Sequence, residues 1–144
     1  MGLFGPRRDP GDLRQLQIAV HELGHAWVWK AHGLIIRGIE HTGSDGTCHV
    51  RHYSDTESLR AYAIGLWAGF EAEDQWLRAN GLGRARRSTS SYDIRQFRRT
   101  NRELGPHSLS EAKARSLARR TVHRHWNAIE AAAPRLITKG RLSL

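Results

Sequence analysis

The sequence predicts a mainly helical α+β domain with one small β-hairpin. Apolar residues recur at helical spacing through most of the chain, and Gly or Pro separates the segments that carry them. Between residues 34 and 53, two short segments flank a run of turn-forming residues. The chain has 144 residues, 39% of them hydrophobic, which suits one domain with its own core. We expect a single domain over residues 1–144, with a flexible lead at 1–11 and a loose tail at 135–144.

The first predicted helix begins after Asp12 and ends at Gly33. The Asp carboxylate can accept hydrogen bonds from the first backbone N–H groups, and Gly favours the conformation that ends a helix. The apolar residues between them follow helical spacing: Leu13, Leu16, Val20, Leu23 and Trp27. The pentapeptide HELGH, residues 21–25, therefore lies inside a helix.

A β-hairpin is expected beside this helix, followed by three further helices. The hairpin has strands at 34–41 and 47–53, joined by the sequence TGSDG. The later helices are expected at 54–80, which opens with capping-box spacing, at 92–104, and at 108–133. We expect the last helix to stop near Pro134, because proline lacks the N–H that continues a helix.

The HELGH motif predicts a zinc site. Residues four apart lie on one face of a helix, so His21 and His25 can present two imidazoles to one ion. Zinc lowers the pKa of a bound water, and an adjacent carboxylate, here Glu22, can act as its general base.

The catalytic zinc of a peptidase requires a third protein ligand besides the two histidines. The spacing excludes a metzincin, because position 31 is Ala where that class has His. From the residues alone, the candidate third ligands are Glu71, Glu73, Asp74, Asp93 and the hairpin histidines His41, His49 and His52.

Four segments resemble the FtsH-type zinc peptidase family. AVHELGHAWV is similar to the family's HEAGHA helix, and AGFEAED at 68–74 resembles its glycine-rich GGxAAEE segment. SSYDIRQ at 90–96 is similar to the segment that carries the third zinc ligand, and HWNAIEAAAPRLITKGRLS at 125–143 resembles the family's C-terminal stretch. The resemblance spans roughly residues 16 to 143, and the segments occur in the family's order.

This resemblance implies a zincin-like domain that is a zinc metalloendopeptidase. By the match, His21, His25 and Asp93 bind Zn²⁺ and Glu22 is the catalytic base. Glu73 would orient a zinc-bound His by contacting that residue and not the metal itself. Direct ligation by Glu73 in place of Asp93 stays open. We expect Glu71 and Asp74 to lie on a solvated helix face.

The sequence also departs from that family. It contains neither membrane helices nor a phosphate-binding GxxxxGK[ST] loop, so we expect ATP-independent hydrolysis of proteins or peptides. Delivery of substrate by a separate ATPase and assembly into a homo-oligomer are both open. Tyr92 replaces the family's Asn before the ligand Asp, and the acidic pair is Glu73-Asp74 in place of Glu-Glu.

Composition leaves two alternatives to a peptidase. One cysteine excludes a disulfide framework and a Cys-rich zinc finger, and no apolar run reaches membrane-spanning length, so we expect a cytoplasmic protein without a membrane partner. The net charge of +9 allows a basic nucleic-acid-associated zinc protein, which scattered charges disfavour. The arginines cluster at 84–87 and at 115–124. The other alternative is a peptidase-like module that binds proteins without cleaving them.

Overall fold

The computed structural model describes residues 7–144, so the first six residues of the predicted N-terminal lead (1–11) lie outside it. It has a mainly helical α+β fold with a three-stranded antiparallel sheet, which confirms the predicted fold class. None of the helices in the described part of the chain is long and apolar enough to cross a membrane. The elements are α1 (Leu13–Ala31), β1 (Ile35–His41), β2 (Gly46–Arg51), α2 (Thr56–Leu66), α3 (Ala68–Ala79), a 3₁₀ turn (Arg87–Ser90), α4 (Ser91–Leu104), a second 3₁₀ turn (Gly105–His107), α5 (Glu111–Arg124), α6 (Trp126–Lys139) and β3 (Arg141–Leu142).

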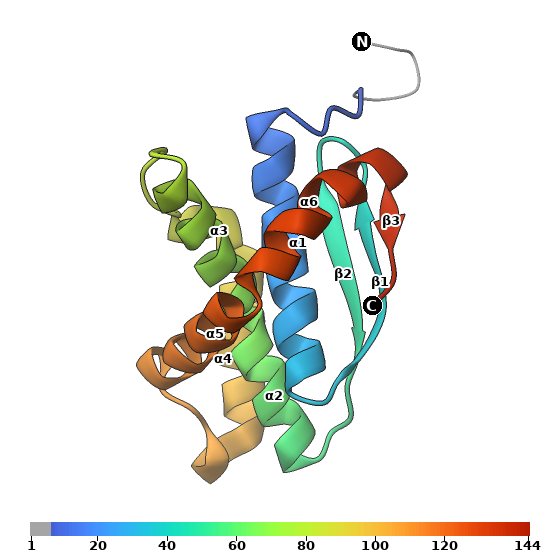
Figure 1. The fold of residues 1–144 in the computed structure, drawn as a ribbon. Helices are drawn as coiled ribbons and strands as arrows, with labels where there is room; N and C mark the ends of the chain where they lie inside the picture. The colour runs from blue at the N-terminus through green and yellow to red at the C-terminus, as the bar shows by residue number, and fades with distance from the viewer. Residues whose placement is uncertain (1–6) are drawn as a thin grey trace.

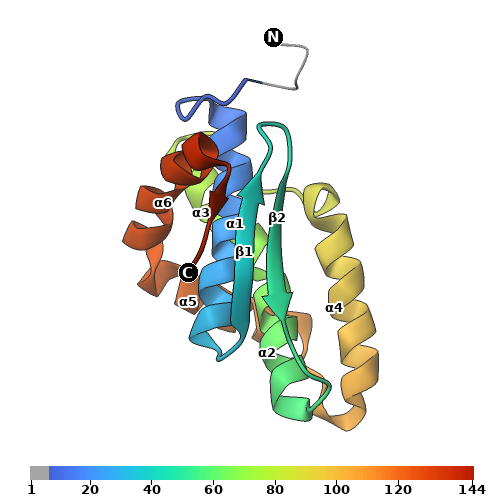
Figure 2. The ribbon, with the colours of Figure 1, turned by 90° about the vertical axis from the view of Figure 1, so that its right-hand side faces the viewer.

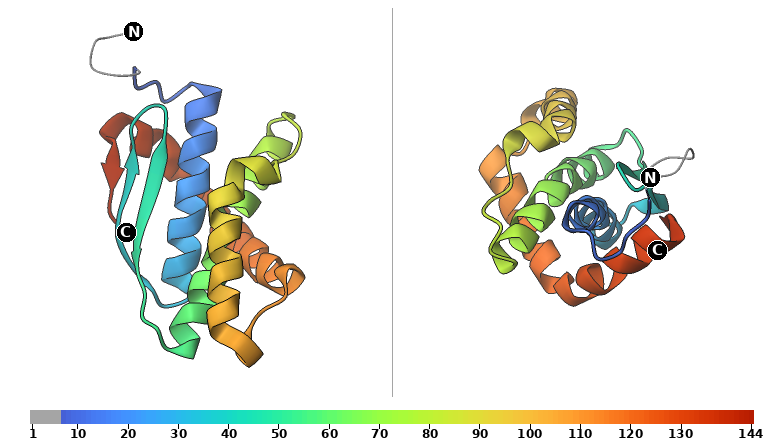
Figure 3. Two further views of the ribbon diagram at one scale, coloured as in Figure 1. Left: turned by 180° about the vertical axis from the view of Figure 1, so that it is seen from behind. Right: turned by 90° about the horizontal axis from the view of Figure 1, so that it is seen from above.

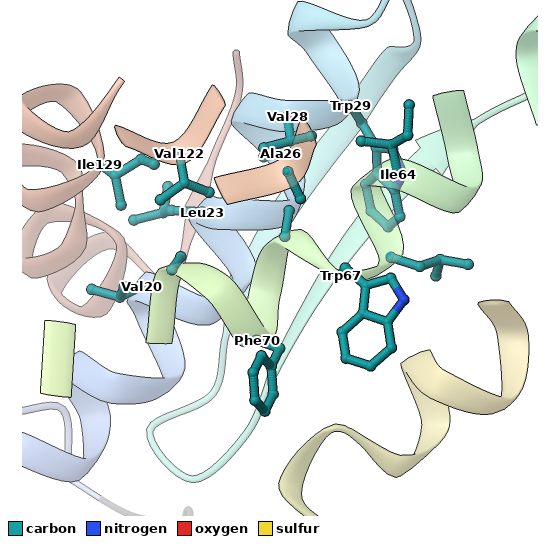
Figure 4. Close-up of a cluster of buried hydrophobic side chains, with 14 of the residues drawn as sticks. Val20, Leu23, Ala26, Val28, Trp29, Ile64, Trp67, Phe70, Val122 and Ile129 are labelled. Atoms are coloured by element: carbon teal, nitrogen blue, oxygen red, sulfur yellow. The ribbon is translucent and has the colours of Figure 1, made fainter. Parts of the chain in front are cut away.

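Helix α1 occupies the centre of the molecule. Asp12 caps it as expected, since its carboxylate accepts a hydrogen bond from the Gln15 backbone N–H at 2.9 Å. Seen from above, α1 lies between the sheet and the other helices (Figure 3). Its apolar side chains Val20 and Leu23 are fully buried and point into the core that α3, α5 and α6 complete (Figure 4). Because α1 is enclosed on these sides, the polar residues Gln15 and His25 that it carries are also buried.

The sheet covers one side of α1, and its strand order is β2-β1-β3 (Figure 1). The predicted hairpin forms β1 and β2, with a β-bulge between Ile36 and Gly38. Strand β3 pairs with the other edge of β1, where Leu142 lies opposite Ile39. Within residues 7–144, no strand pairs with the outer edge of β2, and this edge faces the side on which α4 lies (Figure 2).

Two of the predicted helices differ from the helices in the structure. The helix expected at 54–80 is interrupted at Trp67, which separates α2 from α3. The last helix breaks at His125 and then continues through Pro134 to Lys139. Proline removes one helical hydrogen bond, but the residues that follow it, Leu136 and Ile137, are fully buried in the core. Their burial explains why α6 continues past Pro134.

Both chain ends are tied to the fold over the described residues. The tail at 135–144 is not loose, because it completes α6 and forms β3. Gly140 adopts a left-handed conformation, with φ of 77°, and ends α6 with a hydrogen bond to the Leu136 carbonyl. Near the other end, Arg8 donates to the carbonyls of His41 and Ile137, so the described part of the lead packs against the tail.

Acidic residues of α3 are buried in ion pairs, contrary to the expectation of a solvated face. Glu71 is 4% exposed and accepts hydrogen bonds from Arg115 at 2.9 Å and Arg119 at 2.8 Å. Asp74 is 5% exposed and accepts two hydrogen bonds from Arg84. A buried carboxylate requires such partners, because loss of its hydration is otherwise costly. These pairs tie α3 to α5 and to the loop before α4.

Candidate metal centre

Three side chains from two helices converge at one point. His21 and His25 lie one turn apart on α1, and Asp93 lies in the first turn of α4. Nε2 of His21 is 3.2 Å from Nε2 of His25, and Oδ2 of Asp93 is 3.1 Å and 3.0 Å from these two nitrogens. Around a tetrahedral zinc with bonds of about 2.0–2.1 Å, ligand atoms lie about 3.3 Å apart. The spacing of the three atoms therefore fits such an ion.

The opposite nitrogen of each imidazole ring already has a partner. Nδ1 of His25 is 2.7 Å from the carbonyl of Gly65, which can only accept, so this nitrogen is the donor. Nδ1 of His21 lies 3.0 Å from Oε1 of Glu73 and donates to that carboxylate. In the neutral rings both Nε2 atoms then carry lone pairs that point at each other and at Asp93. Such a group of acceptors requires a cation between them.

The electrostatics of the cluster favour positive charge at the same place. Burial works to lower the pKa of His21, but hydrogen bonds to Asp93 and Glu73 raise it to about 10. Burial likewise opposes the charged form of His25, and the charge of Asp93 raises its pKa. For Asp93, burial works to raise the pKa, and the two histidines lower it. Without a metal ion, a proton supplies this positive charge.

Glu73 lies behind His21, on the side away from the three converging atoms. Its Oε1 accepts from His21, and its Oε2 accepts from the Gln17 side chain at 2.9 Å. Burial works to raise the pKa of Glu73, but the hydrogen bond from His21 lowers it and keeps the carboxylate ionised. Glu73 is therefore placed to orient His21, whereas Asp93 is placed beside both Nε2 atoms.

Two glycines make room for this arrangement. A Cβ on Gly69 would lie 2.5 Å from Nε2 of both His21 and His25. A Cβ on Gly24 would lie 2.5 Å from Cβ of Ala72 and would push α1 away from α3. Glycine inside a predicted helix is a weak signal of such close packing. Here it allows the first turn of α3 to lie directly against the imidazole rings.

A cavity of about 760 Å³ opens beside the three converging atoms. Glu22 lines it from α1, next to His21, and the side chains of Tyr92 and Asp93 line it from α4. The opposite wall is the free edge strand β2, where Gly46 leaves room for Glu22, since a Cβ there would lie 2.8 Å from Cγ of Glu22. A carboxylate, a candidate metal site and an unpaired strand edge thus share one cavity.

The three hairpin histidines, which were also candidate ligands, contact other groups. His41 is buried and bonds to the Gln15 carbonyl, and it accepts from the Gly43 N–H. The ring of His49 lies 3.3 Å from Glu40, and the ring of His52 stacks on that of Tyr62. None of these three histidines joins the metal cluster.

Cys48 also lines the cavity, a position that no pattern in the sequence predicted. Burial and the negative charge of Glu22 raise the pKa of its thiol. The group is therefore neutral at physiological pH. A neutral thiol is a poor nucleophile and a poor metal ligand.

Comparison with protein-family models and with curated protein sequences gives no match for this chain. The resemblance to FtsH-type peptidases therefore stays a prediction that depends on the four sequence segments. Any functional conclusion has to be drawn from the geometry of the metal centre and its cavity.

Proposed function

We propose that this protein is a zinc-dependent metallopeptidase that hydrolyses peptide bonds without ATP. The observation that carries this proposal is the convergence of His21, His25 and Asp93 while the other nitrogen of each ring is already hydrogen-bonded. Two imidazoles and one carboxylate form a common ligand set of catalytic zinc sites, in which a fourth position is left for water or substrate. The cavity beside these atoms supplies the access that such a site requires.

Glu22 is the proposed general base. A zinc ion at this position would act as a Lewis acid that acidifies water and polarises a carbonyl group. Glu22 follows His21 on α1 and lines the same cavity, so it can accept the proton of the attacking water. It then holds that proton and delivers it to the leaving amine.

The proposed substrate is an extended peptide segment. Backbone groups on the free edge of β2 can bind such a segment by strand addition, and the residues of β2 line the cavity along its length. This mode of binding uses main-chain hydrogen bonds, so it suits flexible regions of many proteins. It leaves side-chain selection to the other groups around the cavity.

The four segments described above support membership of the FtsH-type peptidase family as part of this proposal. Under it, the chain is a peptidase domain without a motor and acts in the cytoplasm, on substrates that are already flexible or that a separate ATPase delivers. Glu22 distinguishes it from a peptidase-like module that only binds proteins, since binding alone does not require this carboxylate. A nucleic-acid-associated role is less well supported, because Arg84, Arg87, Arg115 and Arg119 form ion pairs within the protein.

Metal analysis and one substitution test the proposal. Purified protein should contain about one zinc per chain, and chelation followed by zinc addition should remove and restore cleavage of an unfolded protein substrate. Glu22→Gln should keep the zinc and lower kcat by about 10²-fold or more, because the general base is lost. Wild-type protein without stoichiometric zinc would refute the metal site. A Glu22→Gln variant with full activity would refute the role of this carboxylate.

A further inference from the structure

Arg37 lies at the β-bulge of β1 and lines the cavity. The strand pairing moves from Ile36 opposite Val50 to Gly38 opposite His49, so Arg37 is the extra residue between these two pairs. A bulge redirects the side chain of the extra residue. Arg37 accordingly lines the cavity, although it belongs to the central strand.

Arg99 lies on α4, the helix that carries Tyr92 and Asp93 of the cavity lining. Residues seven apart on a helix share a face, two turns from one another, so Arg99 shares the face of Tyr92, which lines the cavity. The positive charge of Arg99 also acts on the phenol of Tyr62, a third residue that lines the cavity, from α2.

Neither arginine is neutralised within the protein. Other arginines pair with carboxylates: Arg84 with Asp74, Arg87 with Glu111, Arg115 and Arg119 with Glu71, and Arg141 with Glu40. By contrast, Arg37 and Arg99 are exposed and form no ion pair with a carboxylate of residues 7–144. Three acidic residues line the cavity, and each has another role. Asp93 belongs to the metal cluster, Glu22 is the proposed base, and Asp45 accepts from the Gly46 N–H in the hairpin turn.

We propose that Arg37, Arg99 and Tyr62 form a subsite that selects an acidic side chain of the bound peptide. This inference rests on the proposed peptidase function and names the substrate class of that site. A guanidinium binds a carboxylate through charge-assisted hydrogen bonds, and a phenol can add a further donor. Two cations, one from β1 and one from α4, also attract acidic segments over a distance and orient them along the cavity.

The register of β2 gives the position of this subsite relative to the cleaved bond. Gly46 lies against Glu22, and Val50, opposite Ile36, lies beside Arg37. Four residues of strand span about 13 Å. A peptide that pairs with β2 therefore places the selected residue about three to four positions from the bond next to Glu22. A neutral peptide can occupy the same strand edge but gains nothing from the arginines.

Binding to a protein that does not cleave tests the subsite separately from catalysis. Zinc-loaded Glu22→Gln protein would be titrated into two labelled peptides of about ten residues that differ only by Glu or Gln at two neighbouring positions, with fluorescence anisotropy as the readout. We expect the Glu peptide to bind about tenfold more tightly. Adding Arg37→Gln and Arg99→Gln should reduce this preference to about twofold or less, whereas lysine at both positions should retain part of it.

The matched control is a pair of arginines elsewhere on α4. Arg98→Gln and Arg102→Gln remove the same charge from exposed positions outside the face of Tyr92, and should leave the preference within about twofold of its starting value. Equal losses in both pairs would mean that only net charge matters, and would overturn the subsite. Tighter binding of a labelled single-stranded oligonucleotide, lost on substitution of Arg37 and Arg99, would also overturn it in favour of nucleic acid.

A second readout fixes the position of the selected residue. Wild-type protein would digest a mixture of unfolded proteins, and mass spectrometry would locate the cleaved bonds. Asp and Glu should be enriched about three to four residues from those bonds, on one side only. Cleavage without such enrichment would refute the subsite and leave the peptidase proposal standing. Absence of any cleavage by wild-type protein would refute the peptidase proposal. The comparison of Glu and Gln peptides would still show whether the subsite selects acidic residues.

Discussion

Replacement of Gly69 by alanine should disrupt the metal centre with only a limited effect on the fold. The added Cβ would lie 2.5 Å from Nε2 of both His21 and His25, whereas ordinary contacts begin at 3.4 Å, so each ring tip must move by about 0.9 Å. Zinc bonds tolerate changes of about 0.2 Å around 2.0–2.1 Å. We therefore expect zinc affinity to fall by at least about 100-fold, comparable to or beyond the loss of a group that orients a ligand.

The expected loss of stability is smaller. Movement of the rings weakens the hydrogen bonds of His25 to Gly65 and of His21 to Glu73, which costs about 1–3 kcal/mol in total. The substitution also raises the free energy of unfolding by about 0.5–1 kcal/mol, because alanine is a better helix former than glycine. The metal-free variant should thus unfold a few degrees below the wild type.

Competition with a chromophoric chelator would measure zinc affinity, and thermal unfolding with and without zinc would measure stability. Gly24→Ala is the informative comparison, because its Cβ would meet Ala72 and the Ala68 carbonyl at 2.5 and 2.7 Å. It should destabilise the protein mainly by separating α1 from α3. If Gly69→Ala bound zinc as tightly as the wild type, the positions assigned to the two Nε2 atoms would be wrong.

Two further expectations concern the ligands themselves. Asp93→Ala should weaken zinc binding by well over 100-fold, because it removes a ligand atom. Glu73→Gln should weaken it by only about 10–100-fold, because it alters the orientation of His21 and removes no ligand. Chelator competition would show this order, and the reverse order would transfer the ligand role to Glu73. In the metal-free protein, hydrogen bonds to Asp93 and Glu73 outweigh burial and raise the pKa of His21 to about 10, so zinc must displace a proton at neutral pH. Apparent zinc affinity should therefore rise by at least about tenfold per pH unit between about pH 6 and 8, and fall again as pH decreases. Calorimetry in buffers of different ionisation enthalpy would count the released protons, and a pH-independent affinity would contradict the cluster described above.

Local signals in the sequence predicted most of the elements correctly. Asp12 caps α1, the turn at 42–46 connects the two strands, and the helix expected at 92–104 differs from α4 by one residue. These features depend on neighbouring residues, so a single sequence is enough to identify them. The strand at the C-terminal end was missed because two residues form a strand only when β1 is beside them. The sequence carries no local sign of that neighbour.

The burial of Glu71 and Asp74 was missed for a related reason. An acidic residue on a helix is usually solvated, and the arginine partners of Glu71 follow it by more than forty residues. Periodicity within α3 cannot reveal such partners. The approach of His21 and His25 to each other, by contrast, follows directly from helical spacing, and the structure places Asp93 and Glu73 at the two ring nitrogens of His21. Zinc itself stays a prediction for the experiments above.

The interruption at Trp67 has a consequence for attempts to redesign this protein. Carbonyls in the last turn of a helix lack helical partners, and the Gly65 carbonyl in the last turn of α2 accepts from Nδ1 of His25. An engineer who made residues 56–79 into one regular helix would expect a more stable protein. The same change would draw that carbonyl into the helix and release His25 to adopt its other tautomer. Regularity and function are therefore in competition at this position, and stabilising designs should leave the irregular turn as it is.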